Sequence, residues 1–446
     1  MAGDFPGDFS LKEVWLYPHF EEKIDIKLLV KEITLYESIH SASLQCTILI
    51  QDIEKNLINK LPLMGEEQIQ IIIKSNKILY DLKYFIYKID GRTMQEKNQS
   101  YVLSCVSLEG LRNENFRICE RVDGKKSEEL VKEILQQSNF TTKKISTPDV
   151  SVYPFNMYIP NWRPFDTIIW LSRRSVPEYK ENSIGYLFYE TFDGFNYNSV
   201  DRLLDQKQYP NDKTNYTFFQ GNQSSGGTGA ADEKYRIMNY SSPKVFDMYD
   251  DLRRGAFAHE CIYVDINNRS YRVFRKNADE FWENSSHAEK VKPFKTTVQG
   301  NVDLLKRGSR FIYRPTTINT WGWKEDQNTE STNNIDPANL NFEKVFFRYY
   351  FLEYNHMEIN IPGDLENRCG NMIYVSIPSP EQKSKEKVVE DARISGRYMV
   401  NTIKHTIINR SELRTTVTLT RDSFGGQPVA DQPVTTGGQV MLEGKN

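Results

Sequence analysis

The residues of this 446-residue chain that could carry out acid–base, nucleophilic or metal chemistry are scattered, and their spacing matches no catalytic motif. The sequence has no Gly-x-Ser-x-Gly elbow and no pair of histidines at metal-binding spacing, and the GGTG at Gly226–Gly229 lacks the Lys and Ser or Thr of a phosphate loop. His405, which lies among apolar residues, is the histidine that most resembles a catalytic base. Because its neighbours alternate as in a strand, we interpret His405 as structural.

The acidic residues give no better candidate for catalysis. Asp and Glu total 60, and a glycosidase needs two carboxylates at a defined separation in space, but no pair stands out. We therefore expect no catalytic, cofactor-binding or metal-binding residues. The tryptophans leave a binding alternative open, because an exposed Trp282, Trp321 or Trp323 could stack on sugars, although packing in a core or an interface is the commoner use of such residues.

Charge and cysteine content narrow the class of protein further. The net charge of −3 gives no field that would attract nucleic acid. The cysteines are odd in number and far apart, which favours reduced, buried thiols and folding in the cytosol. They are Cys46, Cys105, Cys119, Cys261 and Cys369. Without a secretory-signal pattern or an apolar run of about 20 residues, we expect no membrane insertion.

The elements that would position any site are mainly strands. In residues 1–112, apolar residues alternate with polar ones in several runs, as in half-buried strands, and a turn at Leu61–Gly65 separates two groups of them. The runs are Ile24–Leu28, Ile33–Leu35, Leu44–Ile50, Ile69–Ile73, Leu82–Ile89 and Tyr101–Ser107. About six successive strands in this length predict a small antiparallel barrel or sandwich.

The periodicity changes between residues 113 and 235. Ser127 is the expected N-cap of one amphipathic helix, and Pro164 is expected in the first turn of another. Short aromatic strands follow between Asn182 and Tyr197, so this region is a mixed α+β module. Gly221–Ala231 has the composition of a flexible linker.

Residues 236–424 return to strands, with insertions at about 277–345. Helices are expected around Phe246–Arg254 and at Phe342–Tyr354, and the polar segment Gly322–Asn341 indicates a surface excursion. The expected strands are Cys261–Ile266, Tyr271–Arg275, Met357–Ile361 and Met372–Ile377. The clearest signal is Ser395–Ser423, two alternating runs around a polar turn, which predicts a hairpin that closes this second domain.

The spacing of the two strand-rich parts suggests an internal repeat. In each part a Pro/Gly turn precedes three strands, and 17 residues separate Tyr84 from Tyr101 and also Tyr398 from Thr415. Pairwise identity between the parts is low, and any two antiparallel meanders can share such spacing. Duplication and coincidence therefore both stay open.

Several segments resemble the baseplate hub proteins of contractile-tailed bacteriophages, which are related to the spike proteins of type VI secretion. In the first half these segments are Tyr36–Ile39, Ile50–Asp52 and Leu61–Glu67, and in the second half they are Ile361–Pro380 and Ser395–Ser423. The motifs are architectural and each alone is weak. Their order along one chain carries the resemblance, over roughly residues 20–110 and 240–424.

The resemblance implies a mainly β (α+β) fold with two tube-protein-like antiparallel β-barrels and a mixed module between them. It also implies a homotrimeric, pseudo-hexameric ring that joins the sixfold tail tube to the threefold central spike and contacts other baseplate proteins. DNA would pass through its channel without specific binding. The expected location is the baseplate of the virion tail, after assembly in the host cytoplasm. The alternatives are a receptor- or glycan-binding tail protein and the hub of a non-viral contractile injection system.

Residues 425–446 lack a core-forming pattern and indicate a flexible tail. By the same resemblance the end of a hub leads toward the spike. Phe424, Gly425, Gln427 and Pro428 are therefore the residues expected to contact the spike, and a frayed terminus is the other interpretation.

Overall fold

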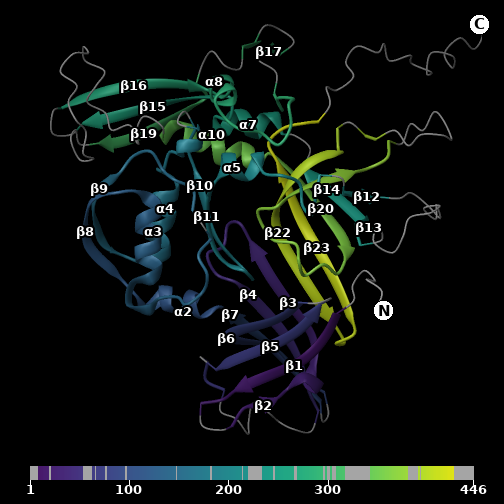
Figure 1. The fold of residues 1–446 in the computed structure, drawn as a ribbon. Coiled ribbons are helices and arrows are strands. Elements are labelled where there is room, and N and C mark those ends of the chain that lie inside the picture. The colour runs from purple at the N-terminus through teal and green to yellow at the C-terminus, as the bar shows by residue number, and fades with distance from the viewer. Residues whose placement is uncertain are drawn as a thin grey trace, which may run out of the picture.

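A computed structural model describes most of the chain between residues 9 and 425, and most of its strands join one fourteen-stranded sheet (Figure 1). The expected mainly β fold class is therefore confirmed. The described residues are 9–19, 22–53, 63–65, 67–75, 78–95, 98–146, 148–180, 183–212, 214–218, 234–244, 247–265, 269–294, 297–298, 302–303, 308–316, 342–379, 390–391 and 393–425.

The first part of this sheet packs around one apolar core, and we call it the first lobe. Its antiparallel strands have the order β2-β1-β5-β6-β7-β4-β3, and alternate residues such as Ile69, Ile71 and Ile73 are fully buried. The elements are β1 Phe9–Tyr17, β2 Ile24–Asp25, η1 Lys27–Leu29, β3 Val30–Ser38, β4 Gln45–Ile53, β5 Gln68–Ser75, β6 Ile78–Gln95 and β7 Asn98–Val106. The prediction of a single strand at Ile24–Leu28 is wrong, because β2 ends at Asp25 and the 3₁₀ turn η1 follows.

A second core is enclosed by the second lobe, in which β14, β20, β23, β22 and β21 are successive antiparallel neighbours. β12 and β13 extend the β21 edge through parallel pairing. The strands are β12 Asn215–Phe218, β13 Arg236–Ile237, β14 Asn239–Lys244, β20 Asn355–Pro362, β21 Met372–Ser376, β22 Gly396–Ile408 and β23 Glu412–Arg421. The strands expected at Met357–Ile361 and Met372–Ile377 lie in β20 and β21.

The two lobes repeat the same five-strand order. In the first lobe the order is β3-β4-β7-β6-β5, and in the second it is β14-β20-β23-β22-β21, with every neighbouring pair antiparallel. Tyr84 lies opposite Ile69 on β5, and Tyr398 lies opposite Ile373 on β21. Both tyrosines are buried. The repeat suggested by the sequence is thereby confirmed at the level of strand order.

The β22–β23 hairpin belongs to both lobes, which the sequence did not indicate. Along one edge of β22, Gly396–Met399 pairs with β21 of the second lobe, whereas Thr402–Ile408 pairs with β3 of the first lobe. Ile407 and Leu413, near the tip of the hairpin, are buried in the core of the first lobe. The hairpin runs in yellow from one lobe to the other in Figure 1. The hairpin therefore joins the two lobes, whereas the sequence predicted only that it closes the second one.

The middle module packs α-helices and short strands around a third core (Figure 1). The helices expected after Lys126 and from Pro164 are present, although Lys126 occupies the N-cap position that was expected for Ser127. The elements are α2 Leu108–Asn115, β8 Ile118–Lys125, α3 Ser127–Gln136, η2 Gln137–Asn139, β9 Phe155–Trp162, α4 Pro164–Ser172, η3 Glu178–Lys180, β10 Tyr186–Thr191, β11 Gly194–Ser199 and α5 Val200–Asp205.

Between β14 and β20 the chain forms an insert around an aromatic core. Trp282 is buried in this core, so its interpretation as a packing residue is confirmed. The elements are α7 Met248–Arg254, β15 Ala258–Asp265, β16 Ser270–Asn277, α8 Ala278–Glu283, β17 Thr297–Val298, β18 Val302–Asp303, β19 Arg310–Thr316 and α10 Phe342–Leu352. In the part of the chain that the structure describes, no helix has the length and apolarity needed to cross a bilayer.

Some expectations fall on residues outside the described ranges. They are the linker Gly221–Ala231, the GGTG of Gly226–Gly229, the excursion Gly322–Asn341, and Trp321 and Trp323.

Candidate functional site: the buried junctions between modules

The tip of the β10–β11 hairpin brings the middle module into the seam between the two lobes. Phe192 and Asp193 form its two-residue turn. The Phe192 N–H donates to Glu37 Oε1 at 2.8 Å, and the Cys369 N–H donates to Glu37 Oε2 at 3.3 Å. One carboxylate on β3 of the first lobe thus holds the backbone of the middle module and of the second lobe together.

Arg368 binds the same hairpin tip from the second lobe. Its Nε donates to Asp193 Oδ2 at 2.8 Å and its Nη2 to Oδ1 at 3.3 Å, a bidentate arrangement. The guanidinium carbon also lies 5.2 Å from the ring centre of Phe192 and 5.6 Å from that of Tyr80 on β6. The first lobe, the middle module and the second lobe therefore meet at Arg368.

Two buried groups at the seam have shifted pKa values. Burial raises the pKa of Glu37 to about 7, and the nearby Arg368 charge and the two backbone N–H groups offset only part of that effect. Burial, helped by Arg368, lowers the pKa of His405 to about 3, so its imidazole is neutral. Because Thr415 Oγ1 accepts the Asp364 N–H, its hydroxyl proton is available for His405 Nδ1 at 2.9 Å. His405 is a core residue, as the sequence indicated.

We expect the Glu37→Gln variant to lose a pH dependence of stability that the wild type has. Because the folded-state pKa of Glu37 is raised from 4.5 to about 7, the folded chain keeps a proton that the unfolded chain releases in this range. The stability contributed by Glu37 is therefore fully present below pH 4.5 and is lost as the pH rises through 7. The loss is on the order of 3 kcal/mol.

Urea titrations of both proteins between pH 4.5 and about pH 8 measure this difference. His405 acts in the opposite direction, because its lowered pKa means that its contribution is lost as the pH falls below 6.5. Both proteins carry His405, so its effect cancels in the comparison. A stability difference between wild type and variant that stays constant across this range would contradict the role given to Glu37.

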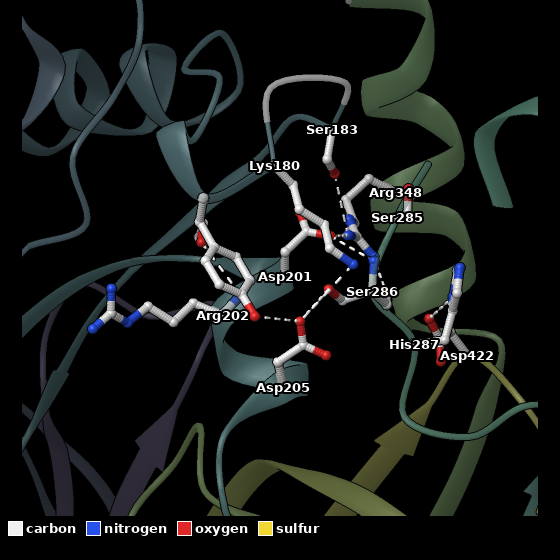
Figure 2. Close-up of polar contacts among 12 residues, drawn as sticks. Lys180, Ser183, Asp201, Arg202, Asp205, Ser285, Ser286, His287, Arg348 and Asp422 are labelled. Carbon is white, nitrogen blue, oxygen red and sulfur yellow. Dashed lines mark hydrogen bonds and ion pairs between the residues drawn. The ribbon is translucent and has the colours of Figure 1, made fainter. Parts of the chain in front are cut away.

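A buried ion pair fixes α5 of the middle module to α10 of the insert (Figure 2). Arg348 Nη2 binds Asp201 Oδ1 and also donates to Ser183 Oγ at 3.3 Å, and Nη1 donates to the Ser286 carbonyl at 3.1 Å. The Ser286 N–H donates to Asp201 Oδ1 at 2.7 Å. Burial alone would raise the pKa of Asp201, but these partners outweigh it and the pKa is lowered. The aspartate is therefore ionised at neutral pH.

The end of β23 is tied to the same loop by a side-chain contact between His287 and Asp422 (Figure 2). His287 Nδ1 lies 2.7 Å from Asp422 Oδ2, and His287 Nε2 lies 2.9 Å from the Trp282 carbonyl. Both ring nitrogens of His287 are thus within hydrogen-bonding distance of an oxygen atom. The His287 ring stacks on the Trp282 ring at 3.5 Å between centroids. The Ala288 N–H donates to Asp422 Oδ1 at 3.0 Å, which closes the contact.

A further junction fixes β10 to the first lobe. Glu190 Oε2 accepts the Leu44 N–H at 2.8 Å and the Ser107 hydroxyl at 2.7 Å. Lys143 lies between Glu190 and Glu109, and its Nζ is 2.7 Å from Glu109 Oε2. Both carboxylate oxygens of Glu190 thus have partners, and removing Lys143 would leave the buried Glu190 charge without its cation.

These junctions are suited to holding modules in place. Each carboxylate is occupied by a cation or by backbone N–H groups of a neighbouring element. Over the ranges that the structure describes, no group of three or more His, Cys, Asp or Glu residues is arranged to hold a metal ion. The arrangement holds the modules to one another through buried polar contacts.

Two of the segments that resemble the hub family contain a glutamate whose role the structure explains. Glu37 belongs to Tyr36–Ile39 and makes the seam contact described above. Glu67 belongs to Leu61–Glu67, and its carboxylate accepts the Met64 N–H at 2.7 Å and the Gly65 N–H at 3.0 Å. The glutamate of each motif therefore orders backbone, in agreement with their architectural interpretation.

Of the four residues expected to contact a spike, the structure describes two. Phe424 exchanges two backbone hydrogen bonds with Val291, at 3.0 and 3.1 Å, and its ring packs against the aromatic core of the insert. Gly425 follows on the surface. Gln427 and Pro428 lie outside the described residues. Phe424 is thus anchored on the insert.

Comparison with known proteins gives similarity in structure and none in sequence. No family model and no curated protein matches the chain. A tail protein from Neisseria meningitidis MC58 matches with a TM-score of 0.52 and 9% identity, over 93% of this chain and 97% of that one. The 43 kDa tail protein of prophage MuSo2 from Shewanella oneidensis matches with a TM-score of 0.51 and 8% identity, over 92% and 98%. The chain therefore has the fold of phage tail proteins, and the expected resemblance is confirmed at the level of the fold.

Proposed function

We propose that this protein is the hub of a contractile-tail baseplate. Three copies would form a ring in which each chain supplies two tube-like lobes, so six similar lobes surround a central channel. Such a ring can stack on a sixfold tail tube on one side and accept a threefold spike on the other. Phage DNA would pass through the channel without sequence-specific binding.

The observation that carries the proposal is the five-strand order that the two lobes share. A closed homotrimer has a threefold axis, and it can present six similar units only if each chain contains two of them. The order β3-β4-β7-β6-β5 and its counterpart β14-β20-β23-β22-β21 supply such a pair. The likeness of the whole chain to two tail proteins supports the same assignment.

The junctions support a structural role over an enzymatic one. The β22–β23 hairpin and the carboxylates of Glu37, Glu190 and Asp201 fix the lobes and the middle module to one another. A hub that stays in place while a tail contracts needs such rigid connections. We assign the protein no catalytic activity and no cofactor.

The C-terminal residues are the proposed spike contact. Phe424 is anchored on the insert through Val291, and residues from Gly425 to Pro428 would continue from there toward the spike. The other proposed partners are the tail tube protein and neighbouring baseplate proteins. The protein would reach the virion tail after assembly in the host cytoplasm.

The purified chain is expected to be a trimer. Light scattering coupled to size exclusion should give a mass three times that of the 52.1 kDa chain, and co-expression with the spike gene of the same cluster should yield a joint complex. A truncation after Ser423 should keep the trimer and lose the spike. A monomer that binds neither tube nor spike would contradict the proposal, and binding of glycans by the isolated chain would favour a receptor-binding tail protein.

A further inference from the structure

The three-stranded sheet of the insert has one covered face and one open face. Its order is β16-β15-β19. On the covered face His259 and Cys261 are buried, and the His259 ring lies 4.4 Å from that of Phe347 on α10, measured between centroids. The helix α10 thus covers the face of β15 that carries His259 and Cys261.

Apart from Glu260 and Arg275 at one end, the residues of the opposite face that the structure describes are apolar and lie in register. Val264 is paired with Tyr271, and Ile262 lies between Val273 on β16 and Tyr313 on β19. Directly paired residues point to the same side of a sheet. The exposed members of this face are Val264 at 36%, Tyr271 at 72%, Val273 at 44%, Phe311 at 55% and Tyr313 at 70% exposure.

Two properties indicate that this face is covered in the assembled particle. The five exposed side chains present roughly 500 Å² of apolar surface, at the size where patches on monomers are commonly functional. The two charged residues at one end of the face, Arg275 and Glu260, have no net charge together, because Arg275 Nε binds Glu260 Oε1 at 2.7 Å. An uncharged, apolar partner surface fits these features.

We propose that an amphipathic α-helix of a different protein of the same tail packs on this face. The outer strands of a three-stranded sheet are about 10 Å apart, which matches the diameter of one helix. A helix there would complete a helix–sheet–helix arrangement, with α10 as the layer on the inner face. The inference rests on the proposed function, because that function supplies the tail in which the partner resides.

A second copy of this chain fits the face less well. Pairing of the face with itself needs a twofold axis, and a closed trimer has only a threefold axis. The area is also below the roughly 800 Å² per partner of a standard stable interface. It suits a short helical segment better than the permanent contact between subunits.

Photo-cross-linking in assembled tails tests the inference. A benzophenone amino acid is placed at Tyr271 or at Tyr313, with Tyr158 as the control because it is similarly exposed, at 60%, on β9 of the middle module. We expect both test positions to cross-link to one segment of a single other tail protein, at residues three or four apart, at least ten times more strongly than the control. Cross-links within this chain or to another copy of it, or a yield equal to that of the control, would overturn the inference.

A variant separates this inference from the proposed function. The double variant Tyr271→Glu, Tyr313→Glu changes only exposed side chains, so the purified protein should remain a trimer with an unchanged melting temperature. Its incorporation into tails should fall at least tenfold relative to Tyr158→Glu. Normal incorporation of a trimeric double variant would overturn the helix-docking inference alone, whereas a monomeric wild type would contradict the hub assignment.

Discussion

Replacing Arg348 with methionine is expected to lower the free energy of unfolding by about 3 to 5 kcal/mol. Arg348 and Asp201 are both almost fully buried, at 2% and 0% exposure. Removing the guanidinium leaves the Asp201 carboxylate in a low-dielectric site with hydrogen bonds from the Ser286 N–H and the Ser183 hydroxyl in place of a cation. An uncompensated buried charge is among the most costly defects in a folded protein. The middle module and the insert would lose their main polar connection.

Denaturant titration of the variant and the wild type measures the effect. The matched control is Arg254→Met, because Arg254 forms an ion pair with Asp250 that is 60% and 38% exposed, and such surface pairs contribute at most about 1 kcal/mol. Adding Asp201→Leu to Arg348→Met should recover part of the loss, since it removes the stranded charge. A single variant that is no less stable than the control would contradict the importance of this junction.

Replacing Gly194 with alanine is expected to destabilise the protein by about 4 kcal/mol, as the sum of backbone strain and steric overlap. Gly194 has φ +123°, a conformation that side chains disfavour, and an added Cβ would lie 2.1 Å from the Lys144 carbonyl oxygen. The residue follows the hairpin tip Phe192–Asp193, so any relief of the overlap moves that tip out of the seam. The contact of the Phe192 N–H with Glu37 would be lost with it.

Thermal unfolding of the Gly194→Ala variant checks this expectation. Gly91→Ala is the control, because Gly91 has φ +62° and nothing within 4 Å of the added Cβ, and it should cost only about 1 to 2 kcal/mol. Equal losses in the two variants would mean that the close approach of Gly194 to Lys144 carries no particular weight.

The local elements of this fold follow from the sequence because they depend on neighbouring residues. Alternation predicts β5, β6, β7 and the Ser395–Ser423 hairpin. The apolar period predicts α3, and Pro164 in the first turn predicts α4. The sharing of β22 between lobes does not follow in this way. It depends on the pairing of Thr402–Ile408 with β3, which lies near the other end of the chain. The alternating pattern of β22 is compatible with many partner strands and registers, so it does not select this one.

Two of the junction residues are recognisable in the sequence by their neighbours. Arg348 stands in the run FFRYYF and Glu190 in LFYETF, and a lone charge among aromatic residues is unusual on a surface. Such a pattern indicates a buried, paired charge. It cannot name the partner, because Asp201 lies 147 residues from Arg348 and only the folded chain brings them together.

Image averaging of the purified protein by electron microscopy is the most direct test of the central claim. The proposed hub predicts a ring of threefold symmetry with six similar lobes around an open channel, in which neighbouring lobes alternate between those built on β3–β7 and those built on β14 and β20–β23. Single, unassembled particles, or a closed assembly without a central channel, would contradict it.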